Sequence, residues 1–290
     1  MISVIITAFN EPNTIGRAIE AFLKQKQPDM EILVVCPDMA TKKAALKYDG
    51  VKVIKDKGKG KPSALNTAFK HARGDVLVLS DGDVYVDKNI LRELLGPFQD
   101  PKVGAVSGRP VSLSSRKDLF GYWSHFLTDA AHSIRIKRFK NDEYVVCSGY
   151  LCAIRARLVK EIPKDALVED SVISYKILKA GYQIAYASQA QVFVKYPTNF
   201  NDWLKQKRRT LGGELQIRTF IGKSPRMRSF LKEALEGSIF ALRYPKNLKE
   251  FFWTAVLFPA RFFAWTLAFW DTKIRKKPLH LIWKRIESTK

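Results

Sequence analysis

Short apolar runs alternate with amphipathic segments along the first part of the chain. The runs are typical of strands buried on both faces. Between them, apolar residues recur at helical spacing, as at Ile15, Ala18, Ile19 and Phe22. Strands that alternate with helices over short connections predict an α/β fold with a Rossmann-like, mostly parallel sheet. The predicted strands are residues 4–7, 31–35, 51–54, 76–79 and 103–106, and the predicted helices are residues 15–25 and 62–71.

The pattern continues beyond residue 110 with longer segments. Residues 119–139 carry apolar positions at helical spacing and end in basic residues, which predicts a long amphipathic helix. Residues 145–154 are apolar except at Ser148 and Gly149, which predicts a pair of buried strands. A helix is predicted at residues 171–179, closed by Gly181 as a glycine C-cap.

The 76–79 strand ends in two carboxylates separated by one glycine, Asp81-Gly82-Asp83. Ligand sites in open α/β sheets lie beyond the carboxyl ends of the strands, so both side chains are expected at a cleft. Two carboxylates this close repel each other unless a cation lies beside them, and hard oxygens suit Mn²⁺ or Mg²⁺. Gly82 is expected to leave room for a diphosphate. A plain Asp-Gly turn is the simpler alternative.

Two common ways of holding a nucleotide are absent from the sequence. The first strand–helix turn lacks the Gly-x-Gly-x-x-Gly fingerprint, and no Walker P-loop occurs. Any nucleotide must therefore be bound by other residues.

Composition adds a strong positive charge to this picture. The 290 residues are 46% hydrophobic, as in ordinary globular proteins, but the formal net charge is +22. Such a surface favours an anionic partner: a phosphorylated substrate, nucleic acid or an acidic membrane leaflet. The three cysteines, Cys36, Cys147 and Cys152, are odd in number and widely spaced, which predicts reduced thiols. The start of the chain has no basic region before its first apolar run, so no signal peptide is expected.

Several motifs occur in a fixed order that resembles family-2 glycosyltransferases of the GT-A fold. The resemblance covers roughly residues 2–213 and implies a nucleotide-diphosphate-sugar donor, a divalent cation (Mn²⁺ or Mg²⁺) and inversion of the anomeric centre. The motifs are Thr7-Ala8-Phe9-Asn10-Glu11, Gly60-Lys61 with Ala64-Leu65-Asn66, Asp81-Gly82-Asp83, Gly149, Glu169-Asp170, Gly181-Tyr182, and Gln206 with Arg209.

The resemblance assigns a role to each matched residue. It implies that Asp83 binds the metal directly and that Asp81 lies near the ribose or the metal. Without the resemblance, Lys61 would be interpreted as a solvent-exposed lysine in a very basic chain. Glu11 would be interpreted as a residue that stabilises the start of a helix. The implied nucleotide-sugar-binding residues are Ala8, Phe9, Glu11, Asp38, Lys61, Asp81, Gly149, Gln206 and Arg209.

The resemblance implies that Asp170 is the catalytic base, supported by Glu169. An inverting displacement needs a carboxylate that takes the proton of the acceptor hydroxyl. An isolated Glu-Asp pair at a helix start would otherwise be read as a cap. Thr210 stands where processive synthases of the family carry a tryptophan after the Gln206–Arg209 pair, which makes a long-chain synthase less expected.

The C-terminal region has a different character. Residues 251–270 are rich in Phe and Trp, and their only charge is Arg261. Arg261 disfavours a spanning helix, and Pro259 is expected to break the helix. The aromatic residues, with the basic residues that follow, predict two amphipathic segments lying in a membrane surface. The second interpretation of residues 251–270 is a membrane-spanning helix, and the third is a helix that docks within a soluble oligomer.

Together these observations predict a metal-dependent, inverting hexosyltransferase. The donor is a UDP- or GDP-sugar, and the acceptor is a lipid-linked saccharide or a polyprenyl or dolichyl phosphate at the cytoplasmic face of the membrane. A sugar nucleotidyltransferase and a nucleic-acid-binding protein are the alternatives; nucleic acid is not expected as a partner, because the basic residues are spread along the chain. The predicted division is a nucleotide-sugar-binding half (1–110), a catalytic-base half (111–215) and a helical membrane-association region (216–290).

Overall fold

The computed structural model describes residues 1–25, 27–221, 240–275 and 286–289. The chain divides into two compact units. Unit 1 comprises Met1–Pro110, Ile136–Lys164 and Glu169–Val194. Unit 2 comprises Val111–Arg135, Asp165–Val168 and Lys195–Lys290. The three-part division made from the sequence stays a prediction.

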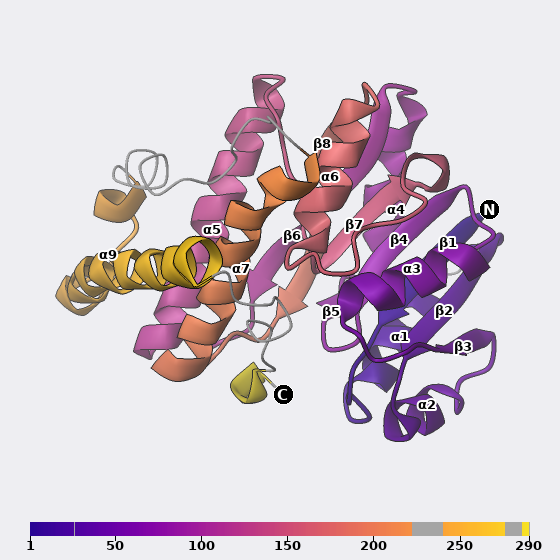
Figure 1. Cartoon of the computed structure of the whole chain (residues 1–290), viewed down its shortest axis with the longest axis horizontal. Helices are drawn as coiled ribbons and strands as arrows, with labels where there is room; N and C mark the ends of the chain where they lie inside the picture. The colour runs from indigo at the N-terminus through magenta and orange to yellow at the C-terminus, as the bar shows by residue number, and fades with distance from the viewer. Residues whose placement is uncertain (26, 222–239, 276–285, 290) are drawn as a thin grey trace. The chain divides into compact units, whose positions relative to one another are not determined.

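Eight strands within the described residues form one mixed sheet in the order β3-β2-β1-β4-β7-β6-β8-β5 (Figure 1). The first four in this order are parallel, whereas β7 is antiparallel to β4 and to β6. The predicted α/β fold is confirmed. The strands are β1 (Ile2–Thr7), β2 (Met30–Cys36), β3 (Val51–Lys55), β4 (Val76–Asp81), β5 (Tyr85–Val86), β6 (Val103–Ser112), β7 (Leu151–Arg155) and β8 (Gln183–Val194).

The helices predicted at residues 15–25, 62–71, 119–139 and 171–179 are present, and α2 and α4 were not predicted. Figure 1 shows α3 lying across β1 and β2, which it contacts. The α-helices are α1 (Ile15–Leu23), α2 (Met39–Ala45), α3 (Lys61–His71), α4 (Ile90–Leu95), α5 (Leu119–Lys140), α6 (Glu169–Lys179), α7 (Phe200–Ile221) and α9 (Leu248–Phe269). Shorter turns are η1 (Gly96–Gln99), η2 (Ala156–Leu158), η3 (Trp270–Ile274) and η4 (Glu287–Thr289).

The strand register brings several strand ends to one edge. Thr7 at the end of β1 pairs with Val35 of β2 on one side and with Asp81 of β4 on the other. Aliphatic side chains such as Ile5 and Leu33 are fully buried along these strands, so burial of one continuous apolar layer fixes the register. The loops after β1, β2 and β4 therefore start at the same carboxyl edge.

The strand predicted before Gly149 is wrong. Residues 145–148 are buried, but they form no strand, and β7 begins only at Leu151. Their backbone finds side-chain partners instead: the amide of Cys147 donates to Ser174 Oγ at 2.9 Å and that of Ser148 to Ser107 Oγ at 3.0 Å. A buried segment needs its amides paired, and serine hydroxyls do here what a neighbouring strand would otherwise do.

Helix α6 begins two residues earlier than predicted, so Glu169 and Asp170 form its first turn. Its end matches the prediction. Gly181 has φ +84°, its amide donates to the carbonyl of Leu178, and the amide of Tyr182 donates to that of Ile177. This pair of bonds is a Schellman C-cap, which a left-handed glycine permits. The three cysteines are free and buried, as expected.

Unit 2 has an aromatic core built on α5, α7 and α9. Trp123 is 1% exposed; its ring lies 5.1 Å from that of Trp203, and its indole donates to the carbonyl of Trp253 at 2.8 Å. Gly213 lies inside α7, where a Cβ would come within 2.5 Å of Val168, so only glycine allows this close approach. The buried cluster contains Tyr122, Trp123, Phe126, Trp203, Leu211, Ala241, Leu257, Ala264 and Ala268.

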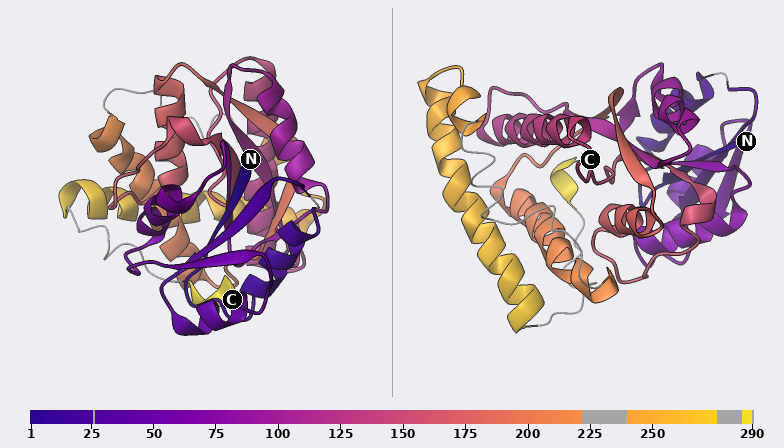
Figure 2. Two further views of the ribbon diagram at one scale, coloured as in Figure 1. Left: turned by 90° about the vertical axis from the view of Figure 1, so that its right-hand side faces the viewer. Right: turned by 90° about the horizontal axis from the view of Figure 1, so that it is seen from above.

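The predicted break at Pro259 is wrong. Helix α9 runs from Leu248 to Phe269 without interruption (Figure 2). Proline removes one helical N–H, and the carbonyl it leaves unbonded belongs to Ala255, whose side chain, like that of Pro259, is exposed. The freed carbonyl therefore lies on the outer side of the helix and not in the core.

One face of α9 is exposed and apolar. Its residues Phe251, Phe252, Phe258, Phe262, Phe263 and Phe269, with Trp270 and Ile274 of η3, are 41–65% exposed. Within the described residues, Leu248–Ile274 is the one segment long and apolar enough to cross a membrane, a test that core helices also pass. Most of the second predicted amphipathic segment, residues 276–285, lies outside the described part of the chain.

Candidate active site

Lys61 joins three parts of unit 1 at the carboxyl edge of the sheet. It is the first residue of α3 and follows Gly60, whose φ of +91° turns the chain into the helix. Its amine lies 2.5 Å from Asp81 Oδ1 and 3.0 Å from Glu169 Oε1, and it donates to the carbonyl of Gly149 at 2.6 Å. One ammonium group thus holds the end of β4, the start of α6 and the loop before β7 together.

Charge explains why this arrangement is stable. Burial lowers the pKa of Lys61, but the nearby carboxylates of Asp81 and Glu169 outweigh it and raise that pKa, so the amine stays protonated. Burial raises the pKa of Asp81 to about 6; Lys61 opposes this rise and Asp83 adds to it. Asp81 also accepts a hydrogen bond from Thr7 Oγ1 at 3.3 Å. Removing the ammonium would leave two carboxylates facing each other.

The acid pair lies against the Gly149 loop. A Cβ on Gly149 would lie 3.2 Å from Asp170 Oδ2 and 3.5 Å from Glu169 Oε1, so any larger residue would press on both carboxylates. Asp170 Oδ1 accepts the amide of Ser171 at 2.8 Å, and its backbone carbonyl accepts Ser174 Oγ at 2.6 Å. The fold therefore brings Glu169 and Asp170, about ninety residues from Asp81 in sequence, to the same edge as Asp81.

The Asp81–Asp83 turn fits a divalent cation. Its two carboxylates are hard oxygen donors that share one turn. Burial is the main cause of the raised pKa of Asp81, and a cation would relieve the repulsion from Asp83 that adds to it. Among the described residues, no group of three or more His, Cys, Asp or Glu side chains could hold a metal. Mg²⁺ commonly takes one or two carboxylates and completes its shell with water and phosphate oxygens, so a pair is a sufficient protein contribution.

The loop after β1 packs against this turn. A Cβ on Gly82 would come within 2.6 Å of Glu11 Oε2 and 2.8 Å of the Ala8 side chain. The sequence analysis expected a diphosphate beside Gly82, but the side chains of Glu11 and Ala8 occupy the position next to its Cα. Gly82 is therefore required for this contact within the protein. Ala8 is buried, whereas Phe9 is 44% exposed at the tip of the loop.

Asp38 links two loops at the same edge. Its Oδ2 accepts the amide of Asn10 at 2.8 Å and its Oδ1 accepts the amide of Thr41 at 2.8 Å, which caps α2. Burial raises the pKa of Asp38, but these backbone bonds outweigh it and lower the pKa below its usual value. The carboxylate stays ionised, and it is positioned beside the Ala8–Glu11 loop.

Two predicted site residues belong to unit 2. Gln206 and Arg209 lie on α7, where Gln206 is 7% exposed. Thr210, which stands at the tryptophan position of the processive-synthase motif, donates its hydroxyl to the carbonyl of Gln206 at 3.0 Å. Ten of the twelve predicted site residues thus lie in unit 1: Ala8, Phe9, Glu11, Asp38, Lys61, Asp81, Asp83, Gly149, Glu169 and Asp170.

Sequence reasoning missed Gln216, a buried residue of α7. Its Oε1 accepts the amide of Leu167 at 3.2 Å and its Nε2 donates to the carbonyl of Asp165 at 3.1 Å. The residues directly before Glu169 in the chain are held by this one amide side chain. A glutamine on a helix gives no sequence signal for such a role; the nearby Gly212-Gly213 pair, unusual within a helix, was the available sign of close packing.

Comparison with known proteins identifies the family. The model of "Glycosyltransferase like family 2" matches residues 1–213, so the chain belongs to that family. The probable glycosyltransferase YdaM of Bacillus subtilis is 28% identical over 278 residues, covering 89% of this chain and 63% of that protein. Poly-β-1,6-N-acetyl-D-glucosamine synthase of Staphylococcus aureus is 27% identical over 234 residues, covering 76% of this chain and 56% of that protein. The chain thus spans 56–63% of the length of these relatives.

Solved structures agree on the fold. The mannosyltransferase PcManGT of Pyrobaculum calidifontis, in complex with GDP-Man and Mn²⁺, has a TM-score of 0.65 at 20% identity, over 94% of this chain and 88% of that one. TarS residues 1–349 of S. aureus, in complex with UDP, has a TM-score of 0.54 at 18% identity, over 86% of this chain and 76% of that one. Together with the family match, they establish the GT-A fold.

Proposed function

We propose that the chain is an inverting, metal-dependent hexosyltransferase that uses a UDP- or GDP-sugar. The observation that carries the proposal is the Lys61 contact between Asp81 and Glu169, because it joins the strand-end carboxylates to the acid pair within a chain of this family. The GDP-Man, UDP and Mn²⁺ of the similar structures support a nucleotide-sugar donor and a divalent cation.

The proposed reaction is a single displacement. The acceptor oxygen forms a bond to the anomeric carbon as the bond from that carbon to the diphosphate breaks. Asp170 takes the proton of the acceptor hydroxyl, and the electron pair of the broken bond stays on the departing nucleoside diphosphate. Gly149, which has no side chain beside Asp170 Oδ2, leaves space for the sugar next to the base.

Charge on the leaving group needs stabilisation. A divalent cation held by Asp83 and Asp81 would neutralise charge that builds on the diphosphate. Lys61 holds Glu169 in place beside Asp170 through an ion pair at 3.0 Å, so the base is oriented before substrate binds. Ala8, Phe9, Glu11 and Asp38 are the proposed contacts to the nucleoside, and Gln206 and Arg209 the proposed contacts to the diphosphate or acceptor.

The acceptor is proposed to be lipid-linked, such as a polyprenyl phosphate or a saccharide carried on one. The exposed aromatic face of α9 and the +22 net charge support a protein that lies on an acidic membrane surface at its cytoplasmic face. Arg261 within this helix makes lying on the membrane cheaper than crossing it.

The test is release of nucleoside diphosphate from a panel of UDP- and GDP-sugars, with Mn²⁺ or Mg²⁺ and a polyprenyl phosphate acceptor. We expect turnover with one donor, dependent on metal, and loss of about 10²–10⁴-fold in Asp170→Asn and of similar size in Asp83→Ala. The exposed Asp49→Asn is the matched control and should retain full activity. No release with any donor, together with tight DNA binding, would refute the proposal.

A further inference from the structure

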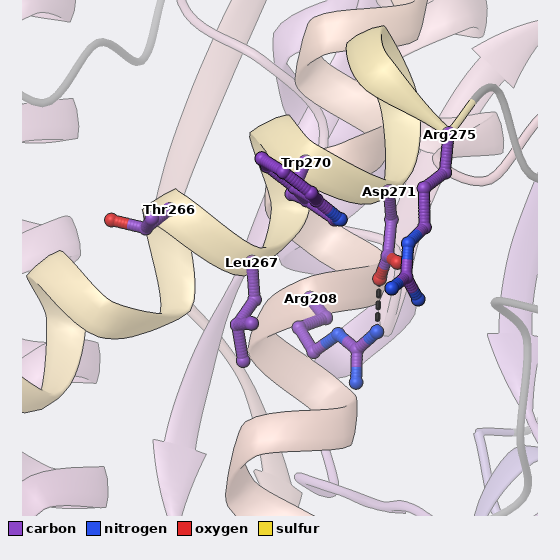
Figure 3. A pocket seen from close by; sticks show the side chains of 6 residues that line it. All are labelled: Arg208, Thr266, Leu267, Trp270, Asp271 and Arg275. Carbon is purple, nitrogen blue, oxygen red and sulfur yellow. Dashed lines mark hydrogen bonds and ion pairs between the residues drawn. The ribbon is translucent and has the colours of Figure 1, made fainter.

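Unit 2 contains a cavity of about 350 Å³ between α7 and the end of α9 (Figure 3). None of its lining residues belongs to the proposed active site. All of them lie in unit 2, so the cavity is complete within one unit. They are Arg208 of α7, Thr266 and Leu267 of α9, Trp270 and Asp271 of η3, and Arg275.

A local change of helix type shapes this cavity. Residues Trp270–Ile274 form a π-helical turn, in which the amide of Arg275 donates to the carbonyl of Trp270 at 2.8 Å. Such turns insert one extra residue, redirect the side chains around them and occur frequently at functional sites. Here the turn brings Trp270 and Arg275 to the same cavity, and the Arg275 guanidinium lies 6.0 Å from the centre of the Trp270 ring.

The polar side of the cavity is suited to an anion. Asp271 is 3% exposed and forms an ion pair with Arg208 (Figure 3), so its negative charge is already neutralised. Arg208 Nε is buried and has no hydrogen-bond partner in the described part of the protein. Arg275 is exposed and forms no ion pair with any described residue. Arg208 thus lines the cavity with its charge paired to Asp271, whereas the Arg275 guanidinium has no acidic partner among the described residues.

The other side of the cavity is apolar and continues along the helix. Leu267 and Trp270 line it, and Phe263 precedes them at helical spacings of four and seven residues, on the same stripe of α9. Phe263 is 48% exposed and Trp270 45%. A ligand that fills the cavity and lies on this stripe must carry an anionic head and an apolar chain.

We propose that this cavity binds the phosphate headgroup of a membrane lipid monophosphate whose chain lies along the exposed stripe of α9. Guanidinium groups bind phosphate through paired, charge-assisted hydrogen bonds, and a phosphate monoester has enough oxygens to reach both Arg208 and Arg275. Charge complementarity and the adjoining apolar stripe favour a lipid over a free phosphate. The proposal rests on the membrane association proposed above, but it is tested without turnover.

The experiment measures binding of the nucleotide-free protein to phosphatidylcholine vesicles that contain phosphatidic acid or, at equal surface charge, phosphatidylglycerol. We expect binding to be about tenfold tighter to phosphatidic acid, as one charge-assisted contact of about 1.5 kcal/mol implies. Arg275→Gln should abolish this preference. Lys273→Gln removes an equal charge from an exposed residue that does not line the cavity, and it should weaken binding to both vesicles equally.

Arg208 is unsuitable as the variant, because its loss would remove the ion pair that the buried Asp271 carboxylate forms. Short-chain phosphatidic acid should displace the protein from vesicles, whereas inorganic phosphate at the same concentration should not. Equal binding to both anionic vesicles, or an Arg275→Gln effect no larger than that of Lys273→Gln, would overturn the phosphate site while leaving membrane association intact. Displacement by inorganic phosphate alone would show that the cavity takes free phosphate. Absence of binding to any vesicle would refute membrane association as well.

Discussion

Charged residues are used differently in the two units. In unit 1, Lys61 is shared among Asp81, Glu169 and the Gly149 carbonyl, and a second carboxylate follows each acid in sequence. In unit 2, Arg116 pairs with Glu250 and Lys205 with Asp202, so each of these two acids has one basic side chain as its ion-pair partner. A dedicated pair fixes a helix end. A shared cation holds several elements together in one cluster of charged side chains, and such clusters are found at functional sites.

Removing the ammonium group of Lys61 is expected to have the largest effect. Lys61→Met should reduce nucleoside diphosphate release by about 10²-fold or more, because the acid pair loses its fixed partner. It should also lower the free energy of unfolding by about 1–3 kcal/mol, because carboxylates are left unpaired. Donor assays and urea unfolding measure the two effects. Lys59→Met, on an exposed residue of the loop that precedes α3, should change neither. Retained activity in Lys61→Met would remove the distinction between the two units.

A change of packing at Gly213 tests whether residues 165–168 help to position the Glu169–Asp170 pair that follows them in the chain. Gly213→Ala places a methyl group 2.5 Å from Val168, so residues 165–168, which lead into Glu169, must shift. We expect a loss of about 1–3 kcal/mol in unfolding free energy and a lower kcat with little change in the affinity for donor. Gly96→Ala is the control, since nothing lies within 4 Å of its Cβ position. Equal kcat in both variants would contradict the role given to this segment.

The smallest effect is expected from a dedicated pair. The Lys205 ammonium and then the Ser288 hydroxyl and amide hold the pKa of Asp202 at about 2. A depressed carboxyl pKa stabilises the fold above the ordinary value of about 4, and this contribution is lost as the pH falls from about 4 to 2. Thermal unfolding of Asp202→Asn should show lower stability at neutral pH and a weaker decline over that range. A decline equal to that of the wild type would assign acid sensitivity to other carboxyls.

The parallel half of the sheet was predictable because most of its strands contain a short apolar run. Residues 76–79 are such a run, and the Asp81–Asp83 turn at its end was identified as the candidate site from this pattern. The buried run at 145–148 misled because its amides bond to Ser107 and Ser174, which lie far away in sequence. A local run of apolar residues indicates that a segment is buried. It does not indicate which group accepts the hydrogen bond of a buried amide.

The candidate site was predictable where a residue's type carries its chemistry. Asp81, Glu169 and Asp170 matched motifs, and the fold brings them to one edge. The role of Lys61 as their common partner depends on tertiary contacts, and Lys61 is one of 50 lysines and arginines in the chain. Gln216 was missed for the same reason. At Pro259 the sequence predicted a helix break that does not occur. Whether proline breaks a helix depends on where the carbonyl left without a hydrogen bond lies, and the sequence does not show this.

Asp38 has a consequence for the thermodynamics of binding. Its two oxygens anchor the amides of Asn10 and Thr41, so the loops after β1 and β2 are ordered by the protein itself. Ordering a loop on binding costs entropy that a ligand must offset, and a loop already fixed removes that cost. A nucleotide that meets this edge should therefore bind with little entropic penalty from these loops. Asp38→Ala should weaken binding mainly through a less favourable entropy.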